Sequence, residues 1–193
     1  RIRELGLLDN SIVFLLADHG HPHGDHGNIL KTPDNLYSEL IRIPFMVRHP
    51  EGAGAGSRFD ALLQTHDFLP TLLDMIGTPQ ESTSMHGQSA WPVVTGEKTT
   101  LRDTIITGYR ESGYRCVRNK EWSYLRTEGD KADELYNLTE DPRETKNVVE
   151  QYPDIAVDLA APLGKYYQMQ RQKIATVHLQ LKYEVADTPT GVG

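Results

Sequence analysis

The sequence holds a single cysteine, Cys116, among its 193 residues. A lone cysteine excludes a disulfide within the chain and leaves the redox compartment undetermined, and we expect it to be a buried, unreactive thiol. No apolar run approaches the roughly 20 residues of a membrane-spanning helix. Basic residues are also in the minority, at 20 against 27 acidic ones, and no long basic run occurs. The net charge of −7 therefore argues against nucleic acid as the partner.

What the chain does contain is enough apolar side chain for a folded core, since 38% of its residues are hydrophobic. The most informative stretch runs from Ser11 to Lys31. It opens with six consecutive apolar residues, Ile12–Ala17, and then changes abruptly to Asp18-His19-Gly20. An unbroken apolar run predicts a strand that is buried on both faces. Because ligands of open α/β sheets bind beyond the carboxyl ends of strands, we expect chemistry at Asp18 and His19.

The segment after Gly20 is rich in histidine. Before it reaches Lys31 it carries His21, His23, Asp25 and His26. A carboxylate beside an imidazole at a strand end suits a divalent cation, so Asp18 and His19 are candidate metal ligands. For His21 and His23, the favoured interpretation is a solvated polar loop. Asp25 and His26 are equally suited to bracing the loop through hydrogen bonds.

Five motifs follow one another over about residues 10 to 160. The first is Asp-His-Gly after the apolar run, then Gly-Asp-His-Gly, with Lys31 thirteen residues beyond Asp18. The others are Leu36–Glu39 with Ile43-Pro44-Phe45, Asp67–Leu73, His86–Ser89, and Glu134–Leu138 with Asp141, Pro142, Glu144 and Asn147. In this order the motifs resemble the carboxy-terminal half of a type I sulfatase, a family of the alkaline phosphatase superfamily.

The resemblance implies a site and a substrate. By the family pattern, Asp18 and His19 would bind a divalent metal, with calcium as the first choice and manganese as the second. Lys31 would contact a sulfate or leaving-group oxygen during catalysis. The implied substrate is a small-molecule or glycan sulfate ester.

The family's nucleophile motif is absent from this chain. Sulfatases carry Cys-x-Pro-x-Arg or Ser-x-Pro-x-Arg near the amino terminus, and its Cys or Ser becomes a formylglycine. Neither motif occurs here, and Cys116-Val117-Arg118 does not fit it. We therefore expect the chain to be the C-terminal fragment of a larger enzyme, inactive alone, with the missing N-terminal part of the same chain as its partner.

Two other functions stay open at this point. Many sulfatases have asparagine where this chain has His19, and a histidine there also fits phosphonate monoester and phosphodiester hydrolases of the same superfamily. The second alternative is a non-catalytic module in which the histidine loop captures a transition metal.

The predicted fold class is α/β, with three segments. Residues 1–98 would be the C-terminal part of the sulfatase catalytic domain, an alkaline-phosphatase-like mixed sheet with flanking helices. Residues 99–173 would be a small four-stranded antiparallel sheet packed with a C-terminal helix. Residues 174–193 would form a tail, with an edge strand as one option.

The expected elements follow from periodicity and turn residues. Strands are predicted at Ile12–Ala17, Ile43–Arg48, Thr104–Tyr109, Tyr114–Arg118, Ser123–Arg126 and Glu134–Leu138. Helices are predicted over about 33–40, 66–76, 144–150 and 153–173, and a long loop over 78–98. His66 and Asp67, at the start of one helix, are interpreted as capping and packing residues rather than ligands.

Overall fold

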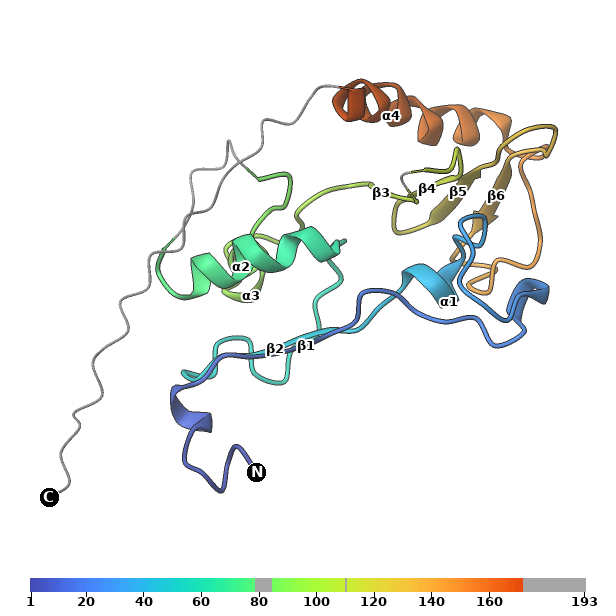
Figure 1. Ribbon diagram of the computed structural model, residues 1–193. Helices are drawn as coiled ribbons and strands as arrows, with labels where there is room; N and C mark the ends of the chain where they lie inside the picture. The colour runs from blue at the N-terminus through green and yellow to red at the C-terminus, as the bar shows by residue number, and fades with distance from the viewer. Residues whose placement is uncertain (79–84, 110, 172–193) are drawn as a thin grey trace, which may run out of the picture. The chain divides into compact units, whose positions relative to one another are not determined.

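The computed structural model of the protein describes residues 1–78, 85–109 and 111–171 (Figure 1). By compactness the chain divides into two units, Arg1–Ala161 and Pro162–Gly193. The domain boundaries predicted at residues 98 and 173 remain predictions. The predicted tail, residues 174–193, lies outside the described residues.

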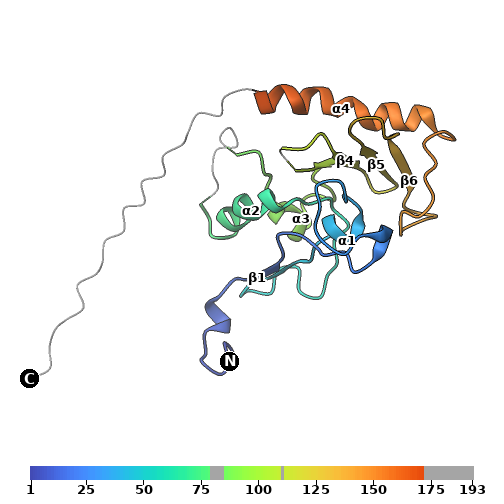
Figure 2. The same cartoon turned by 45° about the vertical axis from the view of Figure 1, so that its right-hand side comes forward.

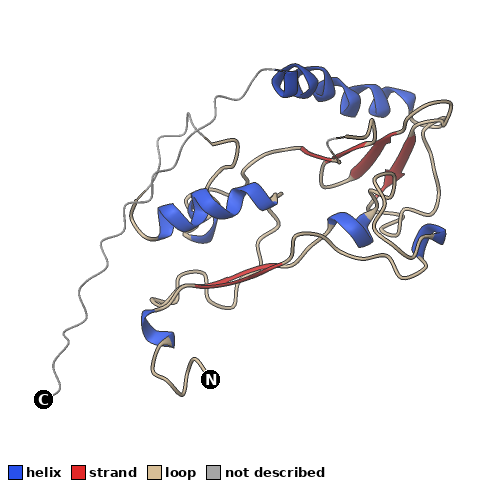
Figure 3. Cartoon of the chain, viewed as in Figure 1, coloured by secondary structure: helices blue, strands red, loops and turns tan. Residues whose placement is uncertain are grey.

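The first sheet is a ribbon of two antiparallel strands, β1 (Val13–Leu16) and β2 (Phe45–Arg48) (Figure 3). Phe14 holds one face of the ribbon, because its ring meets the ring of Phe68 edge to face at 4.9 Å. The prediction that β1 is buried on both faces is wrong, since Leu15 is 56% exposed. In the described part of the chain no third strand flanks the pair, and a two-stranded ribbon cannot cover both of its own faces.

Three short helices accompany this ribbon: α1 (Ser38–Ile41), α2 (Phe68–Met75) and α3 (Trp91–Val94). α3 interrupts the segment that was predicted as a continuous loop. Gly77 ends α2 with a positive φ of 73°. α1 is shorter than predicted and begins five residues later than the proposed start at residue 33.

A buried carboxylate organises the start of α2. Asp67 forms a capping box with Gln64 and accepts hydrogen bonds from the backbone amides of Gln64 at 2.7 Å and Gln88 at 2.8 Å. Both of its oxygens also pair with the guanidinium of Arg102, with one contact of 2.7 Å. These bonds hold the pKa of Asp67 below its usual value although burial alone would raise it. The interpretation of Asp67 as a capping and packing residue is confirmed.

The second sheet confirms the prediction of four antiparallel strands. Its order is β3 (Ile105–Thr107), β4 (Arg115–Arg118), β5 (Trp122–Arg126) and β6 (Glu134–Asn137). Val117 of β4 and Leu135 of β6 are completely buried and both lie in register with Tyr124 of β5. Cys116 is buried as predicted, and this burial raises the pKa of its thiol to about 11.

The segment after β6 is irregular, and the helix predicted over residues 144–150 is wrong. Asn147 ties this segment to the sheet instead, because its side-chain oxygen accepts hydrogen bonds from the amides of Leu135 and Val149, both at 3.0 Å. α4 (Pro153–Arg171) then begins beside the sheet (Figure 2), where the ring of Tyr152 lies 5.2 Å from that of Trp122. Over the described ranges no helix has the length and apolar character needed to cross a membrane.

Glu144 connects three segments that are far apart in the sequence. Its side chain is fully buried, and Oε1 lies 2.6 Å from a guanidinium nitrogen of Arg118 in β4. Its Oε2 accepts a hydrogen bond of 2.7 Å from the backbone amide of Ser38, the first residue of α1. Glu144 also adopts a positive φ of 56°, a conformation rare for a residue with a Cβ. The sheet, α1 and the loop after β6 therefore meet at one carboxylate.

We predict that Glu144→Ala lowers the free energy of unfolding by about 3–5 kcal/mol, because the Arg118 charge would stay buried without its partner. Urea unfolding followed by circular dichroism measures the change. Glu140→Ala is the matched control, because Glu140 lies exposed nearby, and we expect less than about 0.5 kcal/mol for it. Equal midpoints for the two variants would contradict this role of Glu144.

Candidate functional site

The structure brings together the three residues predicted to form the site. Asp18 and His19 follow shortly after β1, and Lys31 returns to them at the end of the histidine-rich loop. His19 Nε2 lies 3.5 Å from Asp18 Oδ2 and 3.1 Å from Lys31 Nζ. The Asp18 side chain is 87% exposed and that of His19 is 34% exposed. A carboxylate, an imidazole and an ammonium group thus converge on a solvent-facing surface.

The hydrogen bonds of His19 define its tautomer. Nδ1 lies 2.6 Å from the backbone carbonyl oxygen of Gly20, which can only accept, so Nδ1 carries the proton and donates it. Nε2 then keeps its lone pair and accepts a hydrogen bond from the Lys31 ammonium. A backbone carbonyl that fixes one ring nitrogen leaves the other free to bind a metal. His19 is therefore prepared to act as a ligand through Nε2.

Asp18 is held in its charged form. The backbone amide of His19 donates a 2.9 Å hydrogen bond to its Oδ1, and this bond lowers the pKa of the carboxyl below its usual value. The nearby positive charge of Lys31 acts in the same direction. The site therefore presents an ionised carboxylate beside an imidazole nitrogen.

This donor set fits part of a divalent metal site. Among the described residues, no group of three or more His, Cys, Asp or Glu side chains is placed to hold a metal ion. Asp18 and His19 supply one oxygen donor and one nitrogen donor, and a calcium or manganese ion needs several more ligands. The two residues are a suitable pair of ligands that other groups must complete.

Gly20 positions the pair through a close backbone approach to α1. Its amide donates a 2.7 Å hydrogen bond to the carbonyl of Leu40, and a Cβ at this position would lie 2.0 Å from the carbonyl oxygen of Glu39. No side chain larger than hydrogen fits there. Glycine at this position is therefore required by packing.

His26 braces the far side of the loop, one of the two roles the sequence left open. Its ring stacks on that of Tyr37, with centroids 3.7 Å apart and planes 7° from parallel. Nδ1 donates to Glu39 Oε1 and Nε2 donates to the backbone carbonyl of Glu144, both at 2.8 Å. Burial favours the neutral ring, but these two acceptors outweigh it and raise the pKa of His26 above 6.5.

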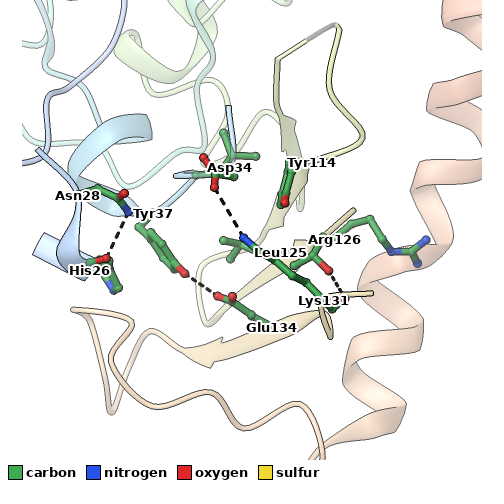
Figure 4. A pocket seen from close by; sticks show the side chains of 11 residues that line it. His26, Asn28, Asp34, Tyr37, Tyr114, Leu125, Arg126, Lys131 and Glu134 are labelled. Atoms are coloured by element: carbon green, nitrogen blue, oxygen red, sulfur yellow. Dashed lines mark hydrogen bonds and ion pairs between the residues drawn. The ribbon is translucent and has the colours of Figure 1, made fainter. Parts of the chain in front are cut away.

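Two hollows are lined in part by His26, and no sequence motif pointed to them. One, of about 270 Å³, is shown in Figure 4, where Tyr37 donates a 2.7 Å hydrogen bond to Glu134 and Lys131 pairs with Asp34 at 3.8 Å. The other, of about 470 Å³, is lined by Glu39 and residues of the loop after β6. Their lining residues come from separate segments, so no local sequence signal marks them as neighbours.

Comparison with known proteins gives a consistent match. Residues 24–172 match the model of the family described as N-sulphoglucosamine sulphohydrolase, C-terminal. The chain is 29% identical to an N-acetylglucosamine-6-O-sulfatase of Bacteroides thetaiotaomicron over 76% of this chain and 28% of that protein. It is 31% identical to a Delta 4,5-hexuronate-2-O-sulfatase of the same organism, over 81% of this chain and 34% of that protein.

A solved structure is similar over most of the described fold. It holds a protein in complex with its substrate, D-glucosamine-2-N,6-O-disulfate, and superposes with a TM-score of 0.75 at 26% identity. The match covers 89% of this chain and 37% of that one. The chain thus spans about a third of the length of the relatives that it matches.

We predict that the contribution of His26 to stability depends on pH. Its folded-state pKa lies above the ordinary value of 6.5, so the stabilisation is complete below that value and is lost as the pH rises through the folded-state pKa. His26→Gln should cost about 1.5–3 kcal/mol near pH 5.5, the range for hydrogen bonds to charged groups, and clearly less near pH 9. Urea unfolding at both pH values measures the difference.

The exposed His86 provides the control for this experiment. His86→Gln should change stability by less than about 0.5 kcal/mol at either pH. A cost of His26→Gln that is the same at both pH values would show that the charged form of His26 contributes nothing to stability.

We also predict that Gly20→Ala destabilises the fold by about 1–3 kcal/mol, because the added methyl group forces the end of β1 away from α1. Gly164→Ala is the control, since no heavy atom lies within 4 Å of a Cβ built there. Alanine is the better helix former, so this control should be neutral or stabilising by up to about 1 kcal/mol. Chemical denaturation of both variants tests the difference, and a neutral Gly20→Ala would contradict the close approach of the two backbones.

Proposed function

The chain belongs to the sulfatase family described as N-sulphoglucosamine sulphohydrolase, C-terminal, and on this basis we propose that it forms the C-terminal part of a metal-dependent sulfatase. The observation that carries the proposal is the convergence of Asp18, His19 and Lys31 at the end of β1. These are the positions where the family pattern has its metal ligands and its lysine.

Lys31 acts on the charge that develops during hydrolysis. When a nucleophile attacks the sulfur of a sulfate ester, the bond from sulfur to the alcohol oxygen breaks and negative charge grows on the oxygens. An ammonium group beside the ester neutralises that charge. Lys31 is the positive group that this chain places beside Asp18 and His19.

Asp18 and His19 hold the metal through the carboxylate and Nε2. Calcium is the first choice and manganese the second, and a divalent ion held there would supply positive charge that polarises the ester oxygens. Nε2 accepts a hydrogen bond from Lys31 in this structure, so a metal held at Nε2 would leave the lysine to another acceptor. A sulfate oxygen is a suitable acceptor, because it is negatively charged and lies in the same site when substrate is bound.

The nucleophile comes from outside this chain. The motif that produces formylglycine is absent from residues 1–193, and the relatives are about three times as long as the match. The amino-terminal part of the same protein supplies the formylglycine and further metal ligands. The 193-residue chain alone is therefore inactive.

The substrate is a sulfated sugar. Two relatives act on sulfated N-acetylglucosamine and hexuronate by their names, and the similar solved structure holds a glucosamine disulfate. The hydroxyl and sulfate groups of a sulfated sugar suit a site that is polar and open to solvent. His19, where many sulfatases have asparagine, favours one alternative, a phosphonate monoester or phosphodiester hydrolase on the same scaffold.

The test uses the longer polypeptide encoded by the same reading frame, in which an amino-terminal part precedes these 193 residues. We expect hydrolysis of glucosamine 6-sulfate to exceed that of matched phosphate and phosphonate esters. Lys31→Ala should lower kcat by about 10²–10³, as expected for loss of one group that stabilises the transition state. Lys146→Ala is the control, because Lys146 is exposed and lies outside the site.

Faster hydrolysis of the phosphate or phosphonate esters would replace the sulfatase proposal with the phosphonate monoester or phosphodiester hydrolase. Equal rates for Lys31→Ala and Lys146→Ala would remove Lys31 from the mechanism. A reading frame without Cys-x-Pro-x-Arg or Ser-x-Pro-x-Arg would argue against formylglycine chemistry.

A further inference from the structure

Two histidines of the loop play no part in the site described above. His21 and His23 are exposed, while Pro22 between them is fully buried. The backbone is fixed on both sides, because the amide of Gly20 donates to the carbonyl of Leu40 at 2.7 Å and the amide of Gly24 to that of Asn28 at 2.8 Å. The two imidazoles therefore project from a short segment that is anchored at its centre and at both ends.

The rings of His21 and His23 lie close enough to share one ion. Their centroids are 5.2 Å apart and their planes are inclined by 56°. A zinc ion bound to an imidazole nitrogen at about 2.0–2.1 Å lies roughly 3 Å from the ring centre, so two imidazoles on one tetrahedral ion have centres about 5 Å apart. The observed separation matches that value before any ion is bound.

We propose that His21 and His23 form a two-imidazole site for a transition-metal ion such as Zn²⁺ or Cu²⁺. Imidazole nitrogen suits zinc and copper, whereas calcium prefers oxygen ligands. Among the described residues no third His, Cys, Asp or Glu joins the pair, so water completes the coordination and the affinity is moderate. Anchoring the segment before binding reduces the ordering cost of chelation.

The proposed site is separate from the pair Asp18 and His19. Nδ1 of His19 is engaged by the carbonyl of Gly20, and its Nε2 accepts from Lys31. The nitrogen that His19 can offer to a metal therefore faces Asp18 and Lys31 and belongs to the other site. The site also does not depend on the proposed sulfatase activity, and its test needs no substrate.

The experiment is a calorimetric titration of the 193-residue chain with Zn²⁺. We expect one zinc per chain, with His21→Gln and His23→Gln each weakening binding by at least about tenfold, the lower bound seen for changes around metal sites. The variant His86→Gln, which replaces another exposed histidine, should bind zinc as tightly as the parent chain does. Unchanged zinc binding in the double variant His21→Gln/His23→Gln would overturn the proposal.

Two further arms distinguish this site from the one at the end of β1. His19→Asn should change the dissociation constant for zinc by less than about twofold. The reason is that His19 is not a ligand of the proposed site, and changes at independent positions have little effect on each other. If His19→Asn loses zinc binding while the double variant retains it, the ion belongs to Asp18 and His19, and the proposal is overturned. Excess Ca²⁺ should fail to displace the zinc.

Electron paramagnetic resonance of bound Cu²⁺ gives an independent signature. The parent chain should show coupling to imidazole nitrogen, and the double variant should lose it while keeping its far-ultraviolet circular dichroism. A nitrogen-coupled spectrum that persists in the folded double variant would overturn the proposal. Retained circular dichroism ensures that any loss reports the ligands rather than unfolding.

Discussion

The buried carboxylate of Glu144 is the interaction on which the arrangement of the loop depends. A buried charge is costly unless it is paired and hydrogen-bonded, and Glu144 meets both conditions through Arg118 and the amide of Ser38. Its backbone carbonyl also accepts from His26, 118 residues earlier in the chain. The loop that carries Asp18, His19 and Lys31 is thus held in place by a residue near the other end of the compact unit.

The same device appears at the start of α2, where Asp67 is buried against Arg102 and two backbone amides. Both carboxylates lie in motifs that resemble those of the sulfatase family, and both are fully buried. Asn147, in the last motif, likewise pairs with the backbone of β6. These motifs therefore preserve buried polar connections between segments, which tolerate substitution poorly because every partner would be left unsatisfied.

Anchoring and exposure are separated along the loop. Gly20 packs against α1 and His26 stacks on Tyr37, so both positions are fixed. Asp18, His21, His23 and Lys31 lie between or beside these anchors and face solvent. A loop built in this way can present several charged and metal-binding groups without burying them. This separation of anchored and exposed positions also explains how one segment can carry the proposed sulfatase ligands and the proposed transition-metal pair.

The sequence by itself determined what depends on near neighbours. The hairpin strands β4 and β5 are close in the chain and separated by a clear turn, and Asp18-His19 had to fall at the end of an apolar run. The thirteen-residue spacing to Lys31, interpreted through the family resemblance, predicted a third group, and the structure has Lys31 Nζ 3.1 Å from His19 Nε2. Only the tertiary structure decided that β1 is half exposed, that Gly20 is required by a backbone contact, and that His26 is bound by Glu144. Each of these outcomes depends on which distant segment comes to lie alongside, and local periodicity carries no information about that.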